Sequence, residues 1–223
     1  MRLALAVLAA SGLAFGPRAQ DTGSIEGTVL LPEKLPPKPV KPPRYPGAKP
    51  PGDYLRGPAV VFLASVPGDH KPDKKVTLEQ VNRQFKPLAL PILRGTTVTF
   101  PNGDDEYHNV FSRSKAKELE LGRYGRGESK EVTFDSPGLV RLRCEIHSNM
   151  HAVILVLENP FFATCDDQGR FKIENVPPGT YTVHAFHEDV EPKDPKADPL
   201  RAAAATVEVK KGAAARADFD LRK

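Results

Sequence analysis

Short apolar runs broken by turn residues constrain the fold of this sequence more than any other feature. Between Ser24 and Leu221, segments rich in β-branched and aromatic residues are separated by clusters of Pro, Gly, Asn and Asp. Short strands at this spacing are typical of β-sandwiches and barrels. The one helical candidate, Leu200 to Ala205, is too short to form a helix on its own. We therefore expect an all-β fold.

The expected strands run along most of the chain. They lie at residues 24–31, 59–66, 76–80, 88–93, 95–100, 131–134, 139–144, 152–157, 170–173, 180–186, 206–210 and 214–221. The last two flank Lys211-Gly212 and are expected to form a closing hairpin.

The N-terminus is expected to direct export. Met1-Arg2 is followed by an uncharged apolar run from Leu3 to Phe15. A short positive start and a run of this length are typical of a secretory signal, which we assign to residues 1–20. The run is shorter than the roughly 20 apolar residues that span a bilayer, so no stable membrane insertion is expected. The protein is thus predicted to be periplasmic or secreted, with a buried N-terminal helix as the alternative.

The charge does not favour nucleic acid as a partner. The net charge is +4, and without residues 1–20, which include Arg2 and Arg18 but no acid, 30 basic residues face 28 acidic ones, giving +2. The basic residues also alternate with acidic ones along the chain, whereas phosphate binding needs clustered, unpaired cations.

Residues 32–58 contain ten prolines. Proline cannot donate a ladder hydrogen bond, so this segment is expected to be an extended, stiff surface loop. A segment that docks on a partner is the alternative.

Sulfur is scarce, and its position is informative. The chain has two Cys and two Met, and one Met is the initiator. This number is too small for a disulfide framework or a Cys-rich zinc module. The other Met, Met150, follows Cys144 by six residues, with His147 midway between them.

The alternation of residues 139–144 directs Cys144 inward. Val140 and Leu142 share its parity, whereas two arginines occupy the other face, so Cys144 projects from the apolar face at the strand end. His147 and Met150 fit one tight loop that folds back over the sulfur. His108 is expected just past the end of another strand.

One thiolate, two imidazoles and a weak axial thioether form the ligand set of a blue-copper site. Zinc prefers a harder fourth ligand or another thiolate. A Cys144–Cys165 disulfide is the competing interpretation, because an exported protein meets an oxidising compartment. His184 and His187 form an H-x-x-H pair, for which surface and interdomain roles are favoured because an offset of three on a strand places the side chains on opposite faces.

The segments His108-Asn109-Val110 and Cys144-x-x-His147-x-x-Met150 resemble the cupredoxins, most closely amicyanin in the short last loop. The resemblance covers about residues 75–157 and implies a Greek-key sandwich holding one type 1 copper. It also implies His108, Cys144, His147 and axial Met150 as ligands, and Asn109 as the residue that ties the two ligand loops. The implied role is electron transfer, not enzymatic catalysis, with transient redox partners docking on an apolar patch near His147. His151 is expected to face solvent.

The flanking segments resemble a second family. Residues 23–29 and 167–183 are similar to the two halves of a carboxypeptidase regulatory-like, transthyretin-type β-sandwich. The expected layout is that sandwich at 21–66 and 159–223, split by a cupredoxin domain at 67–158; two domains in tandem are the alternative. The whole resembles periplasmic cupredoxin proteins of the methylamine-utilisation type. A copper-handling protein or a metal-free β-sandwich interaction module is the alternative function, and no pattern indicates an oligomeric state.

Overall fold

The computed structural model describes residues 21–32, 55–72, 75–190, 198–201 and 203–222. The predicted signal segment and most of the Pro-rich loop lie outside these residues. In the described part the regular structure is β, apart from short 3₁₀ turns such as η2 (Pro199–Arg201), so the all-β prediction is confirmed. No helix in these ranges is long and apolar enough to cross a bilayer.

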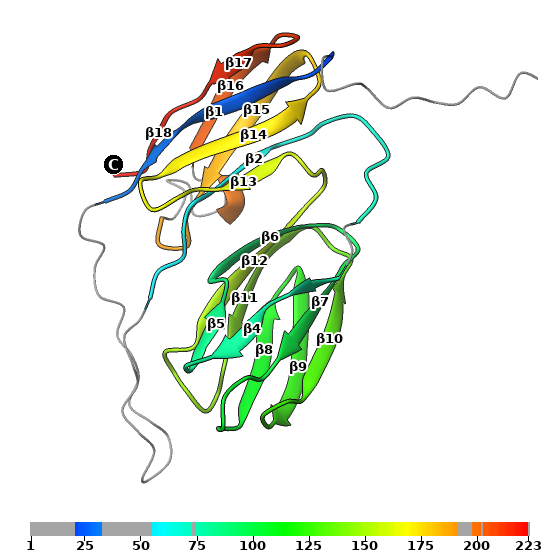
Figure 1. The fold of residues 1–223 in the computed structure, drawn as a ribbon, viewed down its shortest axis with the longest axis vertical. Coiled ribbons are helices and arrows are strands. Elements are labelled where there is room, and N and C mark those ends of the chain that lie inside the picture. The colour runs from blue at the N-terminus through cyan, green and yellow to red at the C-terminus, as the bar shows by residue number, and fades with distance from the viewer. Residues whose placement is uncertain (1–20, 33–54, 73–74, 191–197, 202, 223) are drawn as a thin grey trace, which may run out of the picture.

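The strands fall into two bodies that lie end to end (Figure 1). The first body contains β1 (Gly23–Leu30), β2 (Val60–Leu63), β13 (Phe162–Thr164), β14 (Arg170–Val176), β15 (Gly179–Phe186), β16 (Ala203–Val209), β17 (Ala214–Arg216) and β18 (Phe219–Asp220). One sheet has the order β14-β1-β17, with β18 also paired to β1, and the other has the order β13-β2-β15-β16. The alternating burial of β1 and β14 places their apolar side chains between the two sheets.

The second body contains β3 (Val76–Thr77), β4 (Glu79–Val81), β5 (Gln84–Lys86), β6 (Ala89–Leu93), β7 (Thr96–Pro101), β8 (His108–Ser114), β9 (Lys117–Tyr124), β10 (Ser129–Phe134), β11 (Gly138–Arg143) and β12 (His151–Leu157). A sheet of order β6-β12-β11-β8-β9 faces one of order β10-β7-β3, and β4 pairs with β5 in a hairpin. Their inward side chains form a separate core. The strands of this body lie, in chain order, between β2 and β13 of the first.

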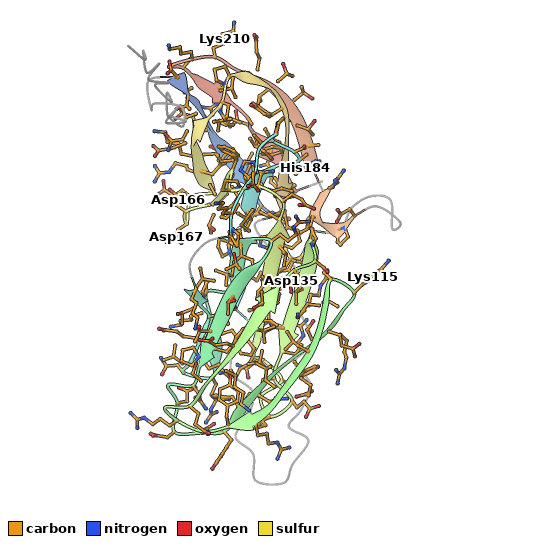
Figure 2. All side chains as sticks on the ribbon, turned by 90° about the vertical axis from the view of Figure 1, so that its right-hand side faces the viewer. Lys115, Asp135, Asp166, Asp167, His184 and Lys210 are labelled. Carbon is orange, nitrogen blue, oxygen red and sulfur yellow. The ribbon has the colours of Figure 1, made fainter. Side chains whose placement is uncertain are left out.

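Strand β12 shows why the two bodies stay together. All seven of its residues are buried, although a strand on the surface of a sandwich normally buries every second side chain. Ile154 faces the core of its own body, whereas Val153 and Leu155 pack in a third apolar cluster with Val60 and Phe62 of β2. Figure 2, turned by a quarter, shows the two bodies meeting close to His184. Apolar burial on both faces of β12 therefore joins the bodies.

The predicted closing hairpin is wrong. β16 pairs with β15, whereas β17 pairs in parallel with β1, so the two segments belong to opposite sheets. The turn at Lys211-Gly212 carries the chain from one sheet to the other. A local turn signal does not distinguish a hairpin from such a crossover, because the partner strands are remote in sequence.

Candidate metal centre

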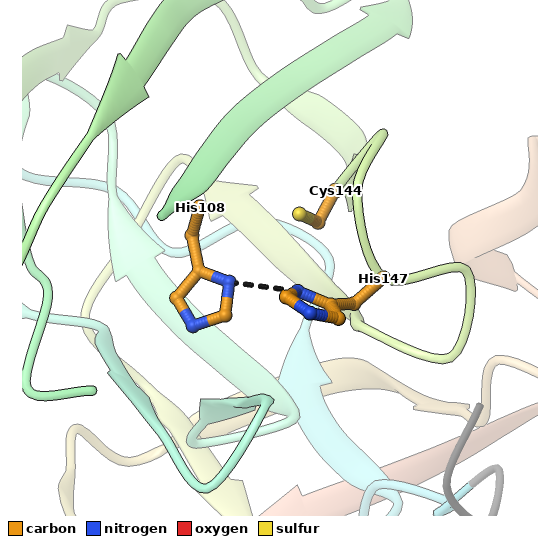
Figure 3. A group of neighbouring side chains, drawn as sticks. All are labelled: His108, Cys144 and His147. Atoms are coloured by element: carbon orange, nitrogen blue, oxygen red, sulfur yellow. Dashed lines mark hydrogen bonds between the residues drawn. The ribbon is translucent and has the colours of Figure 1, made fainter. Parts of the chain in front are cut away.

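Three of the candidate ligands converge at one end of the second body (Figure 3). The ligand atoms of His108, Cys144 and His147 all lie within 4.8 Å of one another. The Nδ1 atoms of the two imidazoles face each other at 3.0 Å. These three residues come from two separate segments of the chain, so the fold, and not sequence proximity, assembles the group.

His108 is the first residue of β8 and is fully buried. The sequence analysis expected His108 just beyond the end of a strand, whereas the structure places it at the start of β8. The pairing of β8 with β9 shifts register between Asn109 and Phe111. Such an irregularity re-aims side chains, and His108, Asn109 and Val110 are all buried here.

Cys144 directly follows β11, and the loop after it closes on itself. The backbone N–H of Cys144 donates to the carbonyl of Met150 at 3.3 Å, and that of Met150 donates to the carbonyl of His147 at 3.0 Å. Cys144 and Met150 belong to the same buried apolar cluster. The loop thus holds a thiol and a thioether on one side and turns His147 toward His108.

Asn109 connects the two segments that carry the candidate ligands. Its Oδ1 accepts a hydrogen bond of 2.7 Å from the backbone N–H of Glu145, next to Cys144. Its Nδ2 donates to Glu120 on β9 at 3.1 Å. Because Asn109 is almost completely buried, these bonds fix the spacing between β8 and the ligand loop.

The surroundings of Cys144 keep its thiol protonated until a metal ion displaces the proton. Burial raises the pKa of its thiol, while the backbone N–H groups of Asn109, His147 and Ile146 act in the opposite direction. The same N–H groups would stabilise a metal-bound thiolate. Cys144 and Cys165 are both free thiols and belong to the cores of different bodies, so the structure contains no bond between them.

Two carboxylates that the sequence analysis did not single out as site residues contact the outer edges of the imidazoles. Asp104 lies 2.8 Å from Nε2 of His108, and Glu106 lies 2.9 Å from Nε2 of His147. Burial opposes ionisation of Asp104, yet hydrogen bonds from the N–H of Arg83, from His108 and from the N–H of Asn82 hold its pKa below the usual value. The signal in the sequence was the run Asp104-Asp105-Glu106 just before His108.

His151 is buried, which corrects the expectation that it faces solvent. Only 1% of it is exposed, because the first body covers this end of β12. Its Nδ1 lies 3.0 Å from the carbonyl of Asn149, and its Nε2 lies 3.3 Å from Glu188 of the first body. It lies outside the group of converging metal-ligand atoms.

His184 and His187 are also buried, which contradicts the surface role expected for this pair but not the interdomain role. Desolvation lowers the pKa of His184, whose ring lies 5.5 Å from that of Phe62. Nε2 of His187 lies 3.1 Å from the carbonyl of Gly57. These contacts keep both imidazoles near the junction between the bodies and away from the candidate metal centre.

The donor set fits a copper ion better than a hard cation. Two imidazole nitrogens, a buried thiol and a neighbouring thioether are soft or intermediate ligands, and no carboxylate belongs to the converging group within the described ranges. Both outer ring nitrogens face carboxylates, which only accept hydrogen bonds. Neutral rings with their protons on Nε2 would leave both Nδ1 atoms available to a metal.

Comparisons with known proteins find similarity only among solved structures. No protein-family model matches the sequence, and a search of curated proteins finds no relative. A Cu-containing nitrite reductase from Thermus scotoductus SA-01 is 29% identical with a TM-score of 0.37, over 43% of this chain and 25% of that chain. The chain thus matches about a quarter of the reductase.

Cupredoxins are also among these structures. A purple cupredoxin from Nitrosopumilus maritimus is 24% identical with a TM-score of 0.32, over 38% of this chain and 99% of that chain. A Cu(I) structure of an amicyanin variant is 17% identical with a TM-score of 0.35, over 43% of this chain and 97% of that chain. Each of these matches covers less than half of the chain.

Proposed function

We propose that the protein is an exported electron carrier with one mononuclear type 1 copper ion. The observation that carries this proposal is the convergence of the ligand atoms of His108, Cys144 and His147 within 4.8 Å in a buried setting. Met150 is proposed as the weak axial ligand, because the loop that holds Cys144 also buries its side chain in the same cluster. A bound copper ion would supply one-electron redox chemistry between its two oxidation states.

The chain's own residues would keep the site nearly unchanged during that chemistry. Asn109 and the short loop from Cys144 to Met150 fix the ligands from both sides. Buried, hydrogen-bonded ligands resist reorganisation, and a small geometric change favours fast electron exchange. The protein would accept one electron from a reduced partner protein and pass one electron to an oxidised partner, with no bond made or broken.

His147 is proposed as the electron port. It is the least buried of the three converging ligands, with 14% of its side chain exposed, whereas His108 is fully buried. Desolvation and, secondarily, the nearby His108 lower the pKa of His147, so the ring is neutral and able to bind a metal near pH 7. Redox partners would dock transiently at this end of the second body.

The remaining parts of the proposal come from the sequence. Residues 1–20 are proposed to direct export to the periplasm or the exterior. The first body is proposed to be a carboxypeptidase regulatory-like sandwich, and its place in this electron carrier is structural support for β12.

Copper loading of the full-length mature chain tests the function. We expect one copper per chain, an intense blue colour and reversible one-electron reduction. The Cys144→Ser variant should lose the colour, whereas Cys165→Ser should keep it, because Cys165 lies in the other core. Stoichiometric copper without colour in the wild-type protein would contradict the electron-transfer proposal and favour copper handling.

A further inference from the structure

The outer nitrogens of both candidate histidines are held by acidic side chains. Nε2 of His108 lies 2.8 Å from Asp104, and Nε2 of His147 lies 2.9 Å from Glu106. The two carboxylates are sheltered, with 14% of the Asp104 side chain and 35% of the Glu106 side chain exposed. A charge-assisted hydrogen bond in such a position is stronger than one in open solvent.

A single turn of the β4–β5 hairpin fixes both carboxylates. The backbone N–H groups of Asn82 and Arg83 donate to the two oxygens of Asp104 at 2.6 and 2.8 Å. The guanidinium of Arg83 donates to Glu106 at 2.7 Å. One turn therefore orients both carboxylates, and this turn lies outside the two segments that carry the candidate ligands.

This turn adopts a backbone that is costly for its sequence. Asn82 and Arg83 have φ angles of 55°, and Val81 pairs directly with Gln84, so the two residues form a primed hairpin turn. A left-handed Arg costs about 1 kcal/mol relative to glycine, which the turn would ordinarily use. Here the side chain of Arg83 has a function that glycine cannot supply, because it holds Glu106.

The buried side chain of Asn102 anchors the loop between β7 and β8, which carries both acidic residues. Asn102, which is 2% exposed, donates from Nδ2 to the carbonyls of Glu106 and Tyr124 at 2.9 and 3.0 Å. Its Oδ1 accepts from the N–H of Asp104 at 2.9 Å. The backbone on both sides of the acidic run is thus anchored to a buried side chain.

From these contacts we propose that Asp104 and Glu106 are positioning residues that set the redox preference of the metal centre. They hold each imidazole with Nδ1 inward, and their negative charge favours the more highly charged Cu(II) over Cu(I), which lowers the reduction potential. The inference rests on the proposed function, and it assigns a role to two residues that do not touch the metal. Partners that hydrogen-bond a ligating His typically contribute 10–100-fold in metal affinity.

The same loop provides a matched control. Asp105 lies between the two acids, carries the same charge, is 82% exposed and pairs with Arg126 on the surface. Asp105→Asn changes the net charge as Asp104→Asn does, without touching either imidazole. A general effect of charge would appear in all three variants, whereas positioning would appear only in Asp104→Asn and Glu106→Gln.

The first experiment needs no copper. Long-range ¹H–¹⁵N spectra of the metal-free full-length chain identify which ring nitrogens carry protons. We expect the proton on Nε2 of both His108 and His147. A proton on Nδ1 with a bare Nε2 in either ring would overturn the proposed positioning.

The second experiment measures Cu(II) and Cu(I) affinities of the wild-type chain and the three variants. Asp104→Asn and Glu106→Gln should each lower the Cu(II):Cu(I) affinity ratio about tenfold, which raises a one-electron potential by about 59 mV. Asp105→Asn should leave the ratio unchanged. Because Glu106 is on the more exposed side of the loop, its variant tests the proposal even if Asp104→Asn does not fold.

The outcomes separate the two proposals. A blue wild-type protein whose Asp104→Asn and Glu106→Gln variants behave like Asp105→Asn would overturn this inference alone. A wild-type protein that binds no copper would overturn the proposed function together with the inference.

Discussion

Replacing Asn109 by Ala removes the hydrogen bond between the two segments that carry the candidate ligands. Asn109 is 1% exposed, and its Oδ1 accepts from the N–H of Glu145 at 2.7 Å. A buried hydrogen bond contributes about 1 kcal/mol, and a donor left without a good acceptor adds at least about 1 kcal/mol. We therefore expect Asn109→Ala to lower the free energy of unfolding by about 2 kcal/mol. In a chain of this size that is about 4–8 °C in Tm.

Thermal unfolding of the metal-free protein, followed by circular dichroism, measures this effect without any contribution from copper. Glu120→Ala is the comparison, because it removes the acceptor of the other half of the Asn109 amide. The Glu120 side chain is 41% exposed, so water replaces it and the loss should stay below about 0.5 kcal/mol. A Tm of Asn109→Ala within about 1 °C of the wild type would refute the idea that this contact ties the segments together.

Three further predictions follow from other parts of the structure. Arg83→Gly should keep or raise Tm by relieving about 1 kcal/mol of left-handed strain, and a Tm several degrees below that of the wild type would contradict this strain. Leu155→Ala should lower the free energy of unfolding by about 3 kcal/mol and leave the copper spectrum unchanged, because Leu155 faces the other body. Wild-type stability of this variant in denaturant unfolding would contradict that packing. Burial raises the pKa of Cys165 to about 12, so its thiol stays neutral in the folded state while the unfolded thiol ionises above about pH 8.5. The free energy of unfolding should accordingly fall as pH rises from about 9 to 12. The fall should be steeper in the wild type than in Cys165→Ala, by up to about 1.4 kcal/mol per pH unit. Equal slopes in the two proteins would disprove the raised pKa of Cys165.

The sequence predicted the placement of Cys144 and His147 because the signals for both are local. The alternation through Leu142 puts Cys144 on the inward face, and the spacing to His147 leaves room for one tight loop; both features are seen in the structure. The all-β fold was equally accessible, because turn residues and β-branched runs act over a few residues. His108 lies in the converging group, although its place at the start of β8 was not foreseen.

What could not be predicted depends on contacts between remote segments. The burial of His151 arises because the first body covers an end of β12 that an isolated sandwich would leave open. The pairing of β17 with β1 brings together residues from opposite ends of the chain, so a local hairpin signal was misleading. The contacts of Asp104 and Glu106 were hidden for the same reason, since they run to a turn at Arg83 whose left-handed backbone no propensity rule favours.

The visible absorption spectrum of the copper-loaded full-length protein tests the central claim most directly. A thiolate of Cys144 bound to Cu(II) beside His108 and His147 predicts an intense blue band that disappears on one-electron reduction and is missing in Cys144→Ser. A colourless protein with one tightly bound copper, or a blue band that survives in Cys144→Ser, would contradict the assignment of this site.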